Sequence, residues 1–277
     1  MSSNDTELGL VLALTLWPHG LTLRAITNGA GHPVLRPADP PKRLENLNNF
    51  LLAAPVLLFS MVAHEYAHGY AALKQGDTTA QQLGRLTWNP IKHIDPFLTI
   101  LMPVMLFWAS NGQFIFGGAK PVPVNPSNYR NYRRGDIIVS LAGVVVNLLL
   151  FPLCALMIVG LGLLGRLIPP GVDTLSLLQV MMVQGILFNL VLAVFNLLPI
   201  PPLDGSHVLK WVLPPAWSLR YQQLGRYGIV ILLVLLWTDI GRPLFEVWMK
   251  PVTVLAQAAM QAVLPFFLKS PYAMGIG

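Results

Sequence analysis

Residues 137–165 read IIVSLAGVVVNLLLFPLCALMIVGLGLLG. This stretch contains no Asp, Glu, Lys or Arg, and a second uncharged stretch lies between Asp173 and Asp204. Both are longer than the roughly 20 apolar residues that a helix needs to cross the hydrocarbon core of a bilayer. A soluble protein of this size would have to hide two such helices from water, so the sequence predicts a membrane protein.

The overall composition supports the same class. Of the 277 residues, 54% are hydrophobic and 11% are charged, whereas about a quarter of the residues of a soluble domain are charged. The net charge is +6, but the 18 Lys and Arg residues are scattered between apolar runs. That distribution favours membrane topology over a nucleic-acid partner. The single cysteine, Cys154, can form neither an internal disulfide nor a Cys-based zinc site.

The remaining apolar runs extend this pattern. Residues 97–109 are apolar, but the run is too short for a membrane-spanning helix and is interrupted by Pro103. Such a run is typical of a re-entrant or interfacial segment. We therefore expect an all-α polytopic membrane protein with about four to six transmembrane helices and a short re-entrant or extended segment between the first and second core helices. The helices that we predict lie at about 48–73, 137–165, 175–198 and 227–238. We also expect a spanning or interfacial tail at 251–268, a short interfacial or partly inserted segment at 8–17 and a loop at 18–47.

The first of these helices contains His64-Glu65-Tyr66-Ala67-His68. Residues four apart lie on the same face of a helix, so both imidazoles can reach one metal ion. Glu65 can hold and deprotonate a water there, which is the physical logic of the H-E-x-x-H pattern in zinc proteases. The alternative is a pair of ordinary core histidines beside an unrelated glutamate. Ionisable groups are expensive at membrane depth, and this cost favours a functional site.

A third ligand for the ion is offered by Asp204. It follows the helix predicted at 175–198, beyond three prolines that break that helix. Irregular backbone at membrane depth is tolerated where it is buried in protein or lines a cavity. An isolated carboxylate there needs a partner, for which Zn²⁺ is suitable. Alternatively, Asp204 is an ordinary turn aspartate that precedes a glycine.

These motifs resemble those of the site-2 protease family of intramembrane metalloproteases. The family combines H-E-x-x-H with a distant N-x-x-P-x-x-P-x-D-G, which here reads Asn196-Leu-Leu-Pro-Ile-Pro-Pro-Leu-Asp204-Gly205. Residues 84–96 and 119–126 resemble the compact branch of the family, which lacks a PDZ domain. Because the resemblance covers about 48–210, we expect three parts: an N-terminal extension and loop (1–47), an intramembrane metalloprotease core (48–210) and C-terminal helices (211–277).

The resemblance implies roles for individual residues. His64, His68 and Asp204 would bind one zinc ion, and Glu65 would be the general base. The family also has a polar residue on its middle helix, within Ala-Gly-Pro-x-x-Asn; this chain has Val144 where the family has proline, and Asn147 in place. An amide there could stabilise an oxyanion or form a helix–helix hydrogen bond.

Three other polar residues have two readings each. Asn196 has the same alternatives as Asn147. His93 is expected near the site as a supporting group or gate, or is simply a polar loop histidine. His207 follows Asp204 by three residues and would be a fourth ligand or a capping group, although three ligands and a water already complete a catalytic zinc site.

Together these features predict an intramembrane zinc endopeptidase. It would hydrolyse peptide bonds of membrane proteins that carry a transmembrane helix, with zinc as its cofactor and the lipid bilayer as its surroundings. The alternatives are a catalytically inactive membrane scaffold and a metal transporter that uses the same residues. The basic loops that follow the first and third core helices place the site nearer the cytoplasmic face by the positive-inside rule. We expect an integral protein of a bacterial cell membrane.

Overall fold

A computed structural model describes residues 10–13, 22–27, 33–37, 43–109, 117–239 and 241–268 of the chain. Its helices are α1 (Arg43–Gln75), α2 (Thr79–Gln82), α3 (Met102–Ala109), α4 (Tyr132–Leu167), α5 (Val172–Asn196), α6 (Asp204–Val212), α7 (Pro215–Gln223), α8 (Gly228–Trp237) and α9 (Gly241–Val263). Short 3₁₀ turns occur at Pro90–His93, Pro126–Asn128, Pro169–Gly171, Leu224–Tyr227 and Leu264–Phe266, and a π-helical turn at Pro96–Leu101 precedes α3.

The prediction of an all-helical polytopic membrane core is confirmed. Among the described residues, three helical segments are long and apolar enough to cross a membrane, namely Leu51–Gln75, Tyr132–Leu167 and Pro169–Asn196. The segment Pro96–Ala109 is apolar but shorter, in agreement with the expected non-spanning element. α8 has 10 residues and α9, which includes much of the predicted apolar tail, has Arg, Glu and Lys in its first half.

The described part of the N-terminal extension contains a small antiparallel sheet, β1 (Leu10–Ala13), β2 (Thr22–Thr27) and β3 (Pro33–Pro37). The prediction of a loop over 18–47 was therefore wrong for β2 and β3, which pair with Arg24 opposite Arg36. The sequence signal for β2 is the alternation of polar and apolar residues in Thr-Leu-Arg-Ala, which has the period of a strand, followed by the β-branched Ile26 and Thr27. Helix α1 also begins earlier than expected, at Arg43.

The core of the molecule is formed where α4, α5 and α9 pack together, with α1 against α4 and α5. Its most deeply buried side chains include Ile158, Ile186, Leu190 and Val252, each 0% exposed. Gly185 lets α5 approach α4 and α1 closely, because a Cβ atom there would lie 2.6 Å from Cys154 Sγ and 3.0 Å from Val56 Cγ1. Small residues have this role in membrane helix packing, where close contact replaces the hydrophobic effect.

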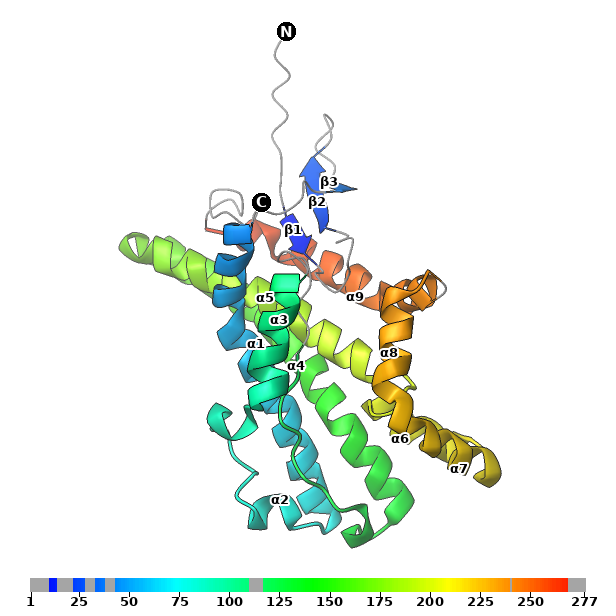
Figure 1. Cartoon of the computed structure of the whole chain (residues 1–277). Coiled ribbons are helices and arrows are strands. Elements are labelled where there is room, and N and C mark those ends of the chain that lie inside the picture. The colour runs from blue at the N-terminus through cyan, green and yellow to red at the C-terminus, as the bar shows by residue number, and fades with distance from the viewer. Residues whose placement is uncertain are drawn as a thin grey trace.

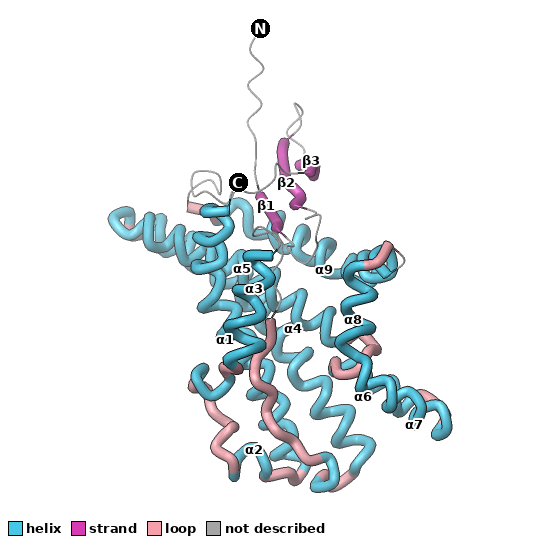
Figure 2. Tube along the Cα trace, in the orientation of Figure 1, coloured by secondary structure: helices cyan, strands magenta, loops and turns pink. Residues whose placement is uncertain are grey.

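The outer surface of α4 is apolar, with Leu149 and Leu156 about two thirds exposed. Such side chains are suited to lipid rather than water. Figure 1 shows that α1 and α4 lie side by side and run in opposite directions, while α6, α7 and α8 gather at one side of the bundle. In Figure 2 the loops on either side of α2 and the segment that leads into α4 reach the end of the bundle where α1 ends.

Candidate metal centre

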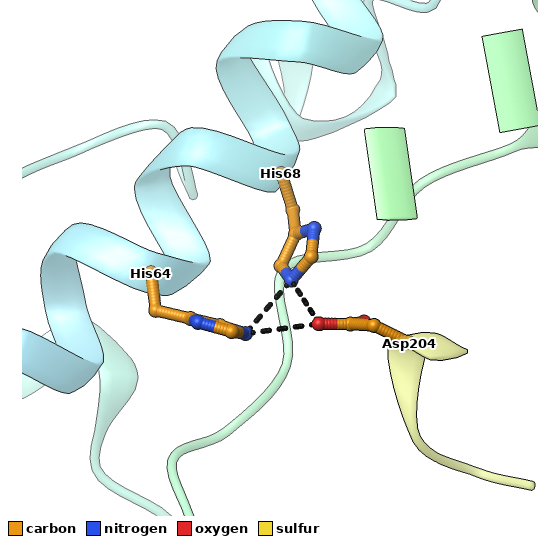
Figure 3. A group of neighbouring side chains, drawn as sticks. All are labelled: His64, His68 and Asp204. Carbon is orange, nitrogen blue, oxygen red and sulfur yellow. Dashed lines mark hydrogen bonds and ion pairs between the residues drawn. The ribbon is translucent and has the colours of Figure 1, made fainter. Parts of the chain in front are cut away.

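His64 and His68 lie one turn apart on α1 and point to the same place. Their Nε2 atoms are 3.0 Å apart. Asp204, the first residue of α6, brings Oδ2 to 3.2 Å from His64 Nε2 and to 3.4 Å from His68 Nε2. Figure 3 shows the three side chains converging from the two helices. The structure thus brings together residues 140 positions apart, the distance in sequence between His64 and Asp204.

The three atoms fit a tetrahedral zinc ion. With zinc–ligand bonds of about 2.0–2.1 Å, two ligands of a tetrahedral site lie about 3.3 Å apart, close to the three distances observed. Asp204 Oδ2 is buried and accepts no hydrogen bond from a protein donor in the described part of the chain. A buried carboxylate oxygen without a donor is costly unless a cation satisfies it. The donor set of two imidazoles and one carboxylate is one that catalytic zinc uses.

The second nitrogen of each imidazole sets the tautomer. His68 Nδ1 lies 2.7 Å from the carbonyl oxygen of Val139, which can only accept a hydrogen bond, so Nδ1 carries the proton. His64 Nδ1 lies 2.5 Å from Asn147 Oδ1 and donates in the same way. Both Nε2 atoms therefore present a lone pair to the centre. Partners of this kind orient metal-binding histidines and raise their basicity.

Asn147 is fully buried on α4, and both ends of its amide are occupied. Oδ1 accepts from His64, and Nδ2 donates to Asn189 Oδ1 at 2.8 Å. Asn189 on α5 in turn donates to the carbonyl of Gly185 at 2.8 Å. This arrangement supports the helix–helix alternative, in which Asn147 orients a ligand, over direct contact with an oxyanion. Val144, in place of the proline of the family motif, lies within continuous helix.

Asn189 was missed by the sequence analysis. It is 1% exposed and completes the amide chain that ends at His64. The available signal was an amide within the uncharged stretch between Asp173 and Asp204. A polar side chain at membrane depth needs a partner, and the same argument that singled out Asn147 applies to Asn189.

Replacement of Asn147 by alanine is expected to weaken zinc binding about 10- to 100-fold, the usual cost of removing a group that orients a metal ligand. Its loss frees the ring of His64 to rotate. The measurement is the zinc dissociation constant of the detergent-solubilised protein, by competition with a chelating dye. The same change at Asn196, whose Nδ2 donates to Leu192 O on its own helix, should leave this constant within about twofold. Equal effects at both positions would contradict the assigned role of Asn147.

Glu65 faces an extended segment, residues 117–125, that lies against α1. Its Oε2 accepts a hydrogen bond of 2.8 Å from the backbone N–H of Val122. Gly69 makes room for this segment, because a Cβ atom there would lie 2.9 Å from Val122 Cγ1. One carboxylate oxygen of the predicted general base is thus held by backbone from another part of the chain.

The extended segment is held at both ends. Lys120 N–H donates to His93 O at 2.8 Å, and Asn125 N–H donates to Asp77 Oδ2 at 2.7 Å. Asp77 is fully buried. Burial alone raises the pKa of a carboxyl group, but donors from Asn125, Thr79 and Asn128 outweigh it and hold the pKa of Asp77 below its ordinary value. Asp77 is therefore a charged acceptor that ties the segment to the end of α1.

The other candidate residues lie outside the ligand group. His93 is fully buried, with Nε2 2.9 Å from Thr87 O, and supports the extended segment through its own carbonyl. Asn196 bonds within α5. His207 Nδ1 lies 3.2 Å from Asp136 Oδ1. Among the described residues, the group of His, Cys, Asp and Glu side chains that could hold a metal ion consists of His64, His68 and Asp204.

Comparison with known proteins shows similarity to proteins that are named as zinc metalloproteases. The model of a family described as "Peptidase family M50" matches residues 171–236. The chain is 40% identical over 189 residues to "Putative zinc metalloprotease YwhC" of Bacillus subtilis (strain 168), covering 67% of this chain and 80% of that protein. It is 32% identical over 237 residues to "Putative zinc metalloprotease Rip2" of Mycolicibacterium smegmatis (strain ATCC 700084 / mc(2)155), covering 83% of each. No solved structure matches it.

Proposed function

The chain belongs to peptidase family M50, and from that premise we propose that it is an intramembrane zinc endopeptidase that cuts membrane-spanning proteins. The observation that carries the proposal is the group of His64, His68 and Asp204, whose three ligand atoms lie within 4.8 Å of one another. This group is formed at apolar helices that suit a bilayer. One zinc ion per chain would occupy it.

The chemistry divides between the ion and the chain. Zinc, when bound, supplies a Lewis acid that polarises a carbonyl and acidifies water. Glu65 takes the proton of the attacking water and passes it to the leaving amine. Its Oε2 is held by Val122 N–H at 2.8 Å, which fixes the carboxylate while the other oxygen serves as base. Asn147 and the Val139 carbonyl keep the two imidazoles in the tautomer that leaves Nε2 free.

The substrate must lose its helical hydrogen bonds before its carbonyls can react, and the extended segment offers a place for the unwound strand. In Lys120–Asn125, Pro121 and Pro123 have no N–H group, and Val122 N–H is bound to Glu65. Pairing with a substrate strand would therefore rest mainly on substrate N–H groups that donate to carbonyls of the segment. Arg85 already binds the carbonyls of Lys120 and Pro121, at 3.1 and 3.3 Å.

The site is proposed to lie nearer the cytoplasmic face of a bacterial membrane. The loops at the end of α1 and before α4, together with the first turn of α4, carry most of the basic residues of the core: Arg85, Lys92, Lys120, Arg130, Arg133 and Arg134. Basic loops are retained on the cytoplasmic side. Labelling of a cysteine introduced at Ser127 by a membrane-impermeant thiol reagent in intact cells would contradict this orientation.

The function is tested with purified protein in liposomes that contain single-span peptides with a Gly-Pro pair within the span. We expect about one zinc per chain by elemental analysis, as a three-ligand catalytic site requires, and cleavage within the span. Removal of the metal by a chelator should abolish cleavage, and added zinc should restore it. Cleavage that persists without metal, or a folded parent without zinc, would overturn the proposal. Zinc without cleavage of any peptide would favour an inactive scaffold.

A further inference from the structure

A second buried polar cluster lies beside the metal centre, and its acidic member is Asp136 on α4. Asp136 is 2% exposed. Its Oδ2 lies 2.7 Å from Lys210 Nζ and 2.6 Å from Trp211 Nε1, and its Oδ1 lies 3.2 Å from His207 Nδ1. All three partners belong to α6, so a single carboxylate ties this helix to α4.

The helix that is tied in this way is the one that carries Asp204. α6 has nine residues and begins at Asp204, with His207 one turn further along. Its first turn is also closely packed, since a Cβ atom at Gly205 would lie 2.1 Å from the carbonyl oxygen of Leu197. A short helix that is fixed near both ends cannot rotate or slide, and the position of its first side chain is then determined.

The same face of α4 holds the histidines. Asp136, Val139, Gly143 and Asn147 are three, four and four residues apart, which is the spacing of a single helix face. Val139 and Asn147 accept hydrogen bonds from His68 and His64. A Cβ atom at Gly143 would lie 2.5 Å from His64 Nε2 and 2.6 Å from His68 Nε2. α4 provides no ligand, yet one face of it contacts both ligand histidines and, through Asp136, the helix of the third ligand.

We propose that Asp136 is a positioning residue for the metal centre, holding α6 so that Asp204 meets the two histidines. The inference rests on the proposed zinc site and adds a residue that the H-E-x-x-H and D-G motifs do not contain. Lys210 neutralises Asp136 in the buried pair, and its side chain is only 10% exposed. Removal of Lys210 leaves the Asp136 charge buried with only its contacts to His207 and Trp211, and removal of the Asp136 charge leaves Lys210 buried without its carboxylate. Either change disfavours the buried charge that remains, and α6 shifts to expose it.

The test compares zinc dissociation constants of the full-length protein in detergent, by competition with a chelating dye, and thermal unfolding of the metal-free protein. Asp136→Asn and Lys210→Met should each weaken zinc binding about tenfold, as loss of outer supporting groups does. The double variant should bind zinc about as tightly as the single variant with the lower affinity, because both changes break the same coupled pair. Trp211→Phe removes a single donor and should weaken binding about threefold.

The matched control is Asp77→Asn, another fully buried carboxylate, which binds the extended segment and not α6. It should lower the unfolding temperature but leave the zinc dissociation constant within about twofold. If Asp136→Asn lowers the unfolding temperature and leaves zinc binding unchanged, Asp136 is only a structural residue and the inference is wrong. If that variant does not fold, unchanged zinc binding in Trp211→Phe overturns it instead. A folded parent without zinc would refute the proposed function itself.

Discussion

Glu65→Gln is expected to stop peptide-bond cleavage while zinc stays bound. A positioned general base contributes about 10²- to 10⁴-fold to the rate, and glutamine cannot take a proton from water. The substitution is otherwise mild, because its amide oxygen can still accept the N–H of Val122, which now donates to Oε2 at 2.8 Å. The extended segment and the ligands therefore keep their places. The measurement is kcat/KM in liposomes together with the zinc content of each preparation.

Glu246→Gln is the matched control, since Glu246 is an exposed residue of α9. It undergoes the same chemical change and should cleave at the parental rate. Cleavage by Glu65→Gln at more than a tenth of the parental rate would remove Glu65 from the mechanism. Loss of zinc together with activity would show instead that Glu65 supports the centre and would leave its role as base unsupported.

The three candidate ligands could be predicted from the sequence because a local pattern points to each of them. The spacing of His64 and His68 follows from the helical repeat alone. Asp204 stands out because prolines end the uncharged helix just before it, and an isolated carboxylate there calls for a cation. The main helices follow from the absence of charge over lengths that only a membrane or a large core can accommodate. Agreement between pattern and structure is therefore best for α1, α4 and α5, with differences of a few residues at their ends.

The supporting groups could not be predicted because they depend on which helix faces meet. Nothing near His68 in sequence indicates that the carbonyl of Val139, 71 residues away, accepts a hydrogen bond from its Nδ1–H group. Asp136 looks like the last charge before a membrane segment, and only the fold shows that it faces Lys210 and Trp211 of α6. The choice between the two roles considered for Asn147 also depended on helix packing. Its amide has partners on α1 and α5, and sequence spacing does not reveal them.

The close fit of α4 against the metal centre leads to the second large effect, which is expected from Gly143→Ala. A Cβ atom at this position would lie 2.5 Å from both Cε1 and Nε2 of His64 and 2.6 Å from His68 Nε2. Carbon and nitrogen atoms that are not bonded need about 3.5 Å, so both imidazoles must move by about an ångström. Metal geometry tolerates only a few tenths of an ångström. We therefore expect zinc binding to weaken by at least about 100-fold, more than for loss of a single orienting group, and cleavage to be lost with it.

Gly160→Ala is the control that isolates this steric effect. Gly160 lies on the same helix and is exposed, and a Cβ atom there has no atom within 4 Å. Alanine is the better helix residue at both positions, so helix propensity acts in the same direction in the two variants and cannot explain a difference between them. Zinc content by elemental analysis and cleavage in liposomes should be parental for Gly160→Ala. If Gly143→Ala also keeps one zinc per chain, α4 cannot lie against the two imidazoles as described, and the support assigned to Val139, Asn147 and Asp136 falls with that packing.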